Sequence, residues 1–275
     1  MQNVRDISAK ELKDYISKKR ENDYLLIDVR EPKEYAANHI PGAVLVPLKH
    51  VELAVLGFDQ DKELIFYCRS GRRSKIAANF VSDLDLAFPA IYNLAGGILS
   101  WQGKGLAGFP RLALFPMDAP LDEILLKAIE LEKGAETFYE VCAQELEQPD
   151  LKESAASLAK LETGHAKAIY QILKGIKPDI EEFGSIYARA KGEIMEGGIE
   201  VSVAILNLMA AEGDPCVNFS EMALEIEFRA YDLYKTLAAR SNTSEETAIF
   251  LRLSEQEKAH ARLIASRLSE CLAGD

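Results

Sequence analysis

Glu162-Thr-Gly-His165 and Glu257-Lys-Ala-His260 are two copies of one motif in a chain of 275 residues. Each copy follows another glutamate at the same distance, since Glu132 precedes Glu162 and Glu227 precedes Glu257 by 30 positions with no insertion. Two glutamates and one histidine of the first copy thus recur 95 residues later in the second. A register this constant indicates an internal repeat. The repeat decides the fold of the C-terminal half.

Apolar residues around these motifs recur at alternating steps of three and four, the period of a helix with one buried face. This pattern predicts four helices, around residues 121–146, 151–172, 223–237 and 250–264. A long crossover over residues 174–218 separates the second helix from the third, so two helix hairpins can pack as an antiparallel bundle. We therefore expect an all-α four-helix bundle over residues 120–275.

The repeated polar residues stand where the buried helix faces otherwise carry Leu or Ala, so their side chains should point inward. Burying four carboxylates without counter-charge costs several kcal/mol each, whereas two divalent cations would neutralise them. Oxygen-rich ligation with some imidazole suits iron, with manganese as the alternative, better than zinc. Any one of these residues alone could be a structural polar contact, but two matching sets favour a metal site. The predicted ligands are Glu132, Glu162, His165, Glu227, Glu257 and His260.

These motifs resemble the ferritin-like superfamily, and within it the rubrerythrin and erythrin group, over residues 118–272. The resemblance implies a dinuclear iron site in which Glu162 and Glu257 bridge the metals, with oxidase or peroxidase chemistry. It also implies that Tyr139 and Tyr234, seven residues after their glutamates, support the metal ligands, although simple core packing stays open for both. Two features depart from the family: no paired Cys-x-x-Cys module is present, and Ala230 stands where rubrerythrins carry an extra glutamate.

The N-terminal half follows a different pattern, in which short β-rich runs alternate with helical segments. The predicted strands are residues 24–28, 43–46, 64–67 and 90–93, with helices near 9–20 and 73–84. Such alternation indicates an α/β domain with a parallel sheet flanked by helices, which we place at residues 1–105. Glycines and prolines then predict a linker over residues 106–119.

Cys68-Arg-Ser-Gly-Arg-Arg-Ser74 directly follows one of these predicted strands. Loop amides, the following helix N-terminus and three arginines all favour a thiolate over a thiol, so Cys68 is the predicted nucleophile. The residues expected to bind an anionic substrate around it are Arg69, Ser70, Gly71, Arg72, Arg73 and Ser74.

Residues 4–105 resemble a single-domain rhodanese, through the segments Asp28–Tyr35, His39–Ala43, Cys68–Ser74 and Asn93–Trp101. The resemblance implies that Cys68 takes sulfane sulfur from a small-molecule donor such as thiosulfate and passes it to a thiol or cyanide acceptor. A cysteine phosphatase is the competing interpretation, but its Cys-x5-Arg motif would need arginine at Ser74. We expect a sulfurtransferase fused to a diiron oxidase or peroxidase. The alternative makes the bundle a non-catalytic module for iron binding or dimerisation.

Composition and charge limit the partners and the cellular location that we expect for this protein. Residues 1–115 hold 16 basic and 14 acidic residues, and the rest of the chain holds 16 basic and 30 acidic. This acidic half disfavours nucleic acid as a partner and suits cations. The N-terminus lacks a secretory signal, which predicts a cytoplasmic location. The longest apolar stretch, residues 201–211, is too short for a membrane span and is compatible with a homodimer surface. The four cysteines, Cys68, Cys142, Cys216 and Cys271, lie far apart and are expected to be reduced.

Overall fold

The computed structural model describes residues 3–84, 86–103, 105–115 and 119–273. The chain divides into two compact units, one of residues 1–110 with 234–255 and the other of residues 111–233 with 256–275. The boundary between residues 110 and 111 falls within the predicted linker, of which residues 116–118 lie outside the described residues. The domain bounds 1–105 and 120–275 stay a prediction.

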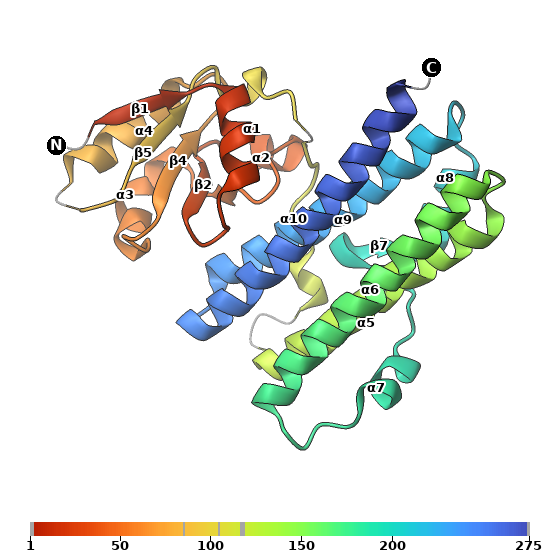
Figure 1. Ribbon diagram of the computed structural model, residues 1–275. Coiled ribbons are helices and arrows are strands. Elements are labelled where there is room, and N and C mark those ends of the chain that lie inside the picture. The colour runs from red at the N-terminus through yellow and green to blue at the C-terminus, as the bar shows by residue number, and fades with distance from the viewer. Residues whose placement is uncertain (1–2, 85, 104, 116–118, 274–275) are drawn as a thin grey trace. The chain divides into compact units, whose positions relative to one another are not determined.

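The N-terminal unit contains one parallel sheet with helices packed on it (Figure 1). Its strands run in the order β1-β5-β4-β2-β3, and every pair of neighbours is parallel. The strands are β1 (Val4–Ile7), β2 (Tyr24–Asp28), β3 (Val44–Leu45), β4 (Glu63–Tyr67) and β5 (Ile91–Leu94). The α-helices are α1 (Ala9–Lys18), α2 (Pro32–Ala37), α3 (Val51–Ala54) and α4 (Arg72–Asp83). The α/β prediction is confirmed.

Strand β1 escaped the sequence prediction because it lies at the sheet edge and buries only Ile7. Strand β4, in contrast, lies at the centre of the sheet, and its last four residues, 64–67, are fully buried. Burial on both faces explains its unbroken apolar run. The carboxyl end of this central strand is the usual place for a binding loop in parallel α/β folds, and Cys68 follows it directly.

Four long helices dominate the C-terminal unit: α5 (Leu121–Glu145), α6 (Pro149–Ile176), α9 (Pro215–Arg240) and α10 (Ser244–Ala273). Figure 1 shows them as two hairpins, α5 with α6 and α9 with α10. The helical-bundle prediction is confirmed. The crossover contains α7 (Phe183–Arg189), β6 (Ile194–Met195), a 3-10 turn (Glu196–Gly198), β7 (Ile199–Glu200) and α8 (Val201–Met209). The pair β6–β7 is a small antiparallel departure from the expected all-α unit.

The expectation of four reduced cysteines is wrong for one pair. Cys216 and Cys271 form a disulfide, with their Cα atoms 5.8 Å apart. Cys216 stands near the start of α9 and Cys271 near the end of α10. An antiparallel hairpin brings those two ends together, which the separation of 55 residues conceals in the sequence. Cys68 and Cys142 are free thiols. No helix in the described ranges is both long and apolar enough to cross a membrane.

Candidate functional site

Cys68 lies in a tightly packed loop between β4 and α4, with 1% of its surface exposed. Gly71 has a φ of +89°, which lets the chain turn directly into α4. A second glycine turn, at Gly96 and Gly97, holds the loop through two backbone hydrogen bonds. The Ile98 amide donates to the Cys68 carbonyl at 2.8 Å, and the Leu99 amide donates to the Arg69 carbonyl at 3.1 Å. The backbone at Gly97 approaches so closely that no side chain fits there.

The Cys68 sulfur accepts hydrogen bonds from its own loop. The Gly71 amide donates to Sγ at 3.2 Å, and the Ser74 hydroxyl lies 3.4 Å from Sγ. Burial raises the pKa of the Cys68 thiol, but hydrogen bonds from the Ser74 side chain and from the amides of Ser74, Ser70 and Gly71 outweigh burial, so its pKa is lowered. The arrangement stabilises a thiolate at the end of β4.

The three loop arginines differ in their surroundings. Arg69 and Arg72 are exposed, whereas Arg73 makes two hydrogen bonds of 2.7 Å to the Glu34 carboxylate. This pairing lowers the pKa of Glu34 to about 2. The structure therefore brings residues 69–74 around Cys68, with Arg73 already neutralised by an acidic partner. Their role in binding substrate stays a prediction.

The second free thiol provides a contrast. Cys142 lies in the apolar core of the bundle and is fully buried. Burial raises the pKa of Cys142 to about 12. A thiol in this environment is not a nucleophile at neutral pH.

The predicted metal ligands all lie in the interior of the bundle, and none is more than 9% exposed. One residue comes from α5, two from α6, one from α9 and two from α10. These six residues are Glu132, Glu162, His165, Glu227, Glu257 and His260. Helical spacing explains the convergence, because Glu-x-x-His places both side chains on one face one turn apart.

His165 is surrounded by carboxylates from three helices. Its Nδ1 lies 3.6 Å from Glu132 Oε2, 3.6 Å from Glu162 Oε2 and 3.4 Å from Glu257 Oε1. These spacings are too long for good hydrogen bonds. Ligands bound at about 2.1 Å to one cation lie about 3 Å from each other. The separations around His165 are therefore close to those of atoms that share an ion.

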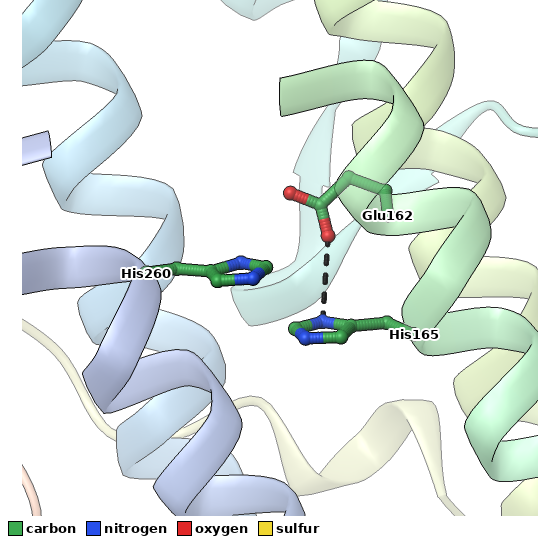
Figure 2. Close-up of side chains that lie close together, drawn as sticks. All are labelled: Glu162, His165 and His260. Carbon is green, nitrogen blue, oxygen red and sulfur yellow. Dashed lines mark ion pairs between the residues drawn. The ribbon is translucent and has the colours of Figure 1, made fainter. Parts of the chain in front are cut away.

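His260 completes the other half of the cluster. Its Nδ1 lies 3.4 Å from Glu227 Oε2. Figure 2 shows its ring parallel to that of His165, with Glu162 beside the pair, and the ring centroids are 4.2 Å apart. Three overlapping groups of three residues have donor atoms within 4.8 Å of one another. The two histidines thus face one compact set of oxygen donors.

Several nitrogen and oxygen atoms in this cluster have no hydrogen-bond partner among the described residues. Glu162 Oε1, His165 Nδ1 and His260 Nδ1 are buried and make no hydrogen bond. Burial, and then the charges of neighbouring carboxylates, raise the pKa of both Glu162 and Glu257. Buried acceptors and charges without partners cost free energy. The donor set therefore fits a dinuclear carboxylate-histidine metal centre.

Tyr139 lies against this cluster. It is fully buried, and its hydroxyl donates to Glu227 Oε1 at 3.0 Å, from α5 to α9. Such a bond orients the carboxylate. Tyr234 is also fully buried, and its support of a metal ligand stays a prediction.

Sequence reasoning missed one carboxylate, Glu196. It lies in the crossover, is 2% exposed, and interacts with Glu132. Burial, followed by the charge of Glu132, raises the pKa of Glu196. Helical periodicity could not find a residue outside the long helices, and its one signal is that Gly197 and Gly198 follow it.

Comparisons with known proteins match the two units separately. The family described as a rhodanese-like domain matches residues 8–104, and the family described as rubrerythrin matches residues 123–213. A sulfurtransferase of Allochromatium vinosum is 34% identical over 84 residues, which is 30% of this chain and 77% of that protein. A putative sulfurtransferase of Bacillus subtilis, YtwF, is 34% identical over 101 residues, covering 37% and 93%. The thiosulfate:glutathione sulfurtransferase of Saccharomyces cerevisiae is 30% identical over 116 residues, covering 38% and 81%.

Proposed function

We propose two activities for this chain, which belongs to the rhodanese family through its N-terminal unit and carries a rubrerythrin domain in its C-terminal half. The first is transfer of sulfane sulfur through Cys68. The second is oxidase or peroxidase chemistry in the helical bundle. Relatives over the first unit are sulfurtransferases, so the chain is a rhodanese-type transferase. The roles of individual residues and the chemistry of the bundle are the proposed part.

The observation that carries the sulfur-transfer proposal is the pair of hydrogen bonds to Cys68 Sγ, from Gly71 and Ser74. They stabilise the negative charge that the nucleophile needs before attack. After attack the outer sulfur of the persulfide carries the anion, and the loop amides together with the arginines of residues 69–73 are proposed to hold it. Exposed Arg69 and Arg72 supply positive charge for an anionic donor.

Thiosulfate is the donor that we propose, in agreement with the name of the yeast relative. The Cys68 thiolate attacks the outer sulfur of thiosulfate, the sulfur–sulfur bond of the donor breaks, and sulfite leaves with the bonding electrons. A thiolate or cyanide acceptor then attacks the outer sulfur of the Cys68 persulfide and releases the Cys68 thiolate. No oxidant or reductant is consumed, because each step exchanges one sulfur bond for another.

The bundle is proposed to hold two iron ions between its six ligand residues, with manganese as the alternative. The unpartnered Nδ1 atoms of His165 and His260, surrounded by carboxylates, support this assignment. A bound iron pair supplies redox chemistry toward oxygen or peroxide. The protein's own contribution is to exclude water from the cluster and to orient Glu227 through the Tyr139 hydroxyl.

The sulfur-transfer proposal is tested with thiosulfate and cyanide. Replacing Cys68 with serine should abolish thiocyanate formation. The matched control is Cys142→Ser, which removes the inert buried thiol and should leave the rate within about twofold of wild type. Transfer that survives in Cys68→Ser would remove Cys68 from its role.

The bundle proposal is tested by loading iron anaerobically and measuring peroxide and oxygen consumption. Glu162→Ala should lose bound iron and turnover. Glu130→Gln is the control, because Glu130 pairs with Lys127 away from the cluster. Two irons bound without turnover in wild type would favour the alternative, in which the bundle is a non-catalytic iron-binding or dimerisation module. A wild-type protein that binds no metal would refute the metal centre and leave only the dimerisation module.

A further inference from the structure

Close backbone packing inserts one segment of the crossover against the ligand helix α5. Gly134 stands two residues after the ligand Glu132, and a Cβ at Gly134 would overlap the Ile194 carbonyl and lie 3.0 Å from the Met195 nitrogen. Only glycine permits this approach of β6 to the helix. Glu196 directly follows Met195 in the chain, and its side chain interacts with Glu132.

Two consecutive glycines then redirect the chain. Gly197 and Gly198 have φ values of +74° and +69°, a left-handed conformation that other residues adopt at a cost. The chain returns through β7, where the Val201 amide donates to the Glu193 carbonyl at 2.9 Å. The turn therefore keeps Glu196 inside the protein, although the chain is exposed at Glu193 before it and at Glu200 after it.

The Glu196 side chain is buried and interacts with the ligand Glu132. It is 2% exposed, and its Oε1 has no hydrogen-bond partner among the described residues. Its charge acts on ligand carboxylates from all four long helices. These carboxylates are Glu132, Glu162, Glu227 and Glu257. A cation at this place would offset the cost of burying an oxygen without a partner beside four carboxylates.

We propose that Glu196 is a seventh protein ligand of the dinuclear centre, supplied by the crossover to the metal on the Glu132 side. This inference rests on the metal centre proposed above. It differs from a third-helix ligand, since position 230 is alanine and Glu196 comes from outside the repeat.

The additional carboxylate makes the two metal positions unequal. Four carboxylates balance two divalent cations, whereas five carry one more negative charge and balance a pair with a total charge of +5. Negative charge close to a metal stabilises its higher oxidation state. Glu196 is therefore expected to lower the reduction potential of the iron pair and to tighten binding at one position only.

The position of Glu196 is tested in the wild-type protein, which removes any question of folding. Crystals grown with Mn²⁺ should show two ions by anomalous scattering, with a Glu196 oxygen about 2.2 Å from one of them. A Glu196 carboxylate more than 3 Å from both ions overturns the inference and leaves the six-ligand centre intact. Failure to bind any Mn²⁺ refutes the centre itself.

The energetic role is tested with Glu196→Gln, which keeps the shape and removes the charge. In Mn²⁺ titrations, one of the two sites should weaken by about 10–100-fold, while the other stays within about threefold. The iron-loaded variant should have a higher midpoint potential. The control Glu130→Gln should match wild type in both measurements. Unchanged affinities and potential in Glu196→Gln would contradict the inference.

A second variant tests how the fold delivers this ligand. Gly134→Ala leaves every ligand in place but pushes β6 away from α5. It should reproduce the loss at one Mn²⁺ site with unchanged helix content by circular dichroism. Binding equal to wild type in Gly134→Ala would show that the close approach does not position Glu196.

Discussion

Replacing Gly97 with alanine is expected to destabilise the N-terminal unit by about 2–5 kcal/mol and to distort the Cys68 loop. Gly97 has a φ of +58°, where an L-residue costs about 1–2 kcal/mol. A Cβ at this position would also overlap the Cys68 carbonyl oxygen and lie 2.6 Å from the carbonyl carbon of Arg69. These are backbone atoms that cannot rotate away, so overpacking adds about 1–3 kcal/mol.

Gly108 offers a matched control in the same unit. Its φ is +89°, but nothing lies within 4 Å of a Cβ added there. Gly108→Ala should therefore cost only the conformational part, about 1–2 kcal/mol. The difference between the two variants isolates the collision of Gly97 with the loop that carries Cys68.

The single tryptophan of the chain, Trp101, makes the measurement specific to this unit. Urea unfolding of the full chain, followed by Trp101 fluorescence, should give a lower midpoint for Gly97→Ala than for Gly108→Ala at similar slope. Thiocyanate formation should fall in Gly97→Ala alone. Equal midpoints and equal activities in the two variants would refute the packing argument.

Three further predictions concern single contacts. Ser74→Ala removes a hydrogen bond to the Cys68 thiolate and so raises the pKa of Cys68. Iodoacetamide alkylation at pH 7 should then be about tenfold slower than in wild type, and its rise with pH should move to higher pH; a pH profile equal to that of wild type would contradict this. Metal-free Glu162→Gln should be more stable than metal-free wild type by about 1–3 kcal/mol, because the burial that raises the pKa of Glu162 makes its charge unfavourable, and this order should reverse with metal in thermal circular dichroism. Reducing the Cys216–Cys271 disulfide, which closes a loop across 55 positions, should cost about 4 kcal/mol by the chain-entropy argument, and Cys216→Ser should show the same loss without reductant.

Local patterns predicted much of the candidate sites. The helical period places Glu162 and His165 on one face, because both follow from spacing along one helix. The strand-loop-helix pattern likewise places Cys68 at the end of β4. In both cases the functional residues lie close together in the sequence, so local spacing is enough to predict them.

Contacts between distant segments could not be predicted in the same way. The pairing of Arg73 with Glu34 depends on how α2 and α4 pack on the sheet, and the sequence offered Arg73 as a free positive charge. Tyr139 was assigned to the buried face of its helix, but its bond to Glu227 depends on the neighbouring hairpin.

Periodicity and spacing are local properties of the chain, so the amino-acid sequence alone predicts a nucleophilic Cys68 in a basic loop and a duplicated carboxylate-histidine set. Tertiary packing, in contrast, brings Glu196 next to Glu132 and pairs Cys216 with Cys271 in a disulfide. Both depend on segments far apart in the chain meeting in space, at Gly134 and at the ends of α9 and α10. Such long-range contacts depend on how the segments pack, and local sequence patterns do not predict that packing.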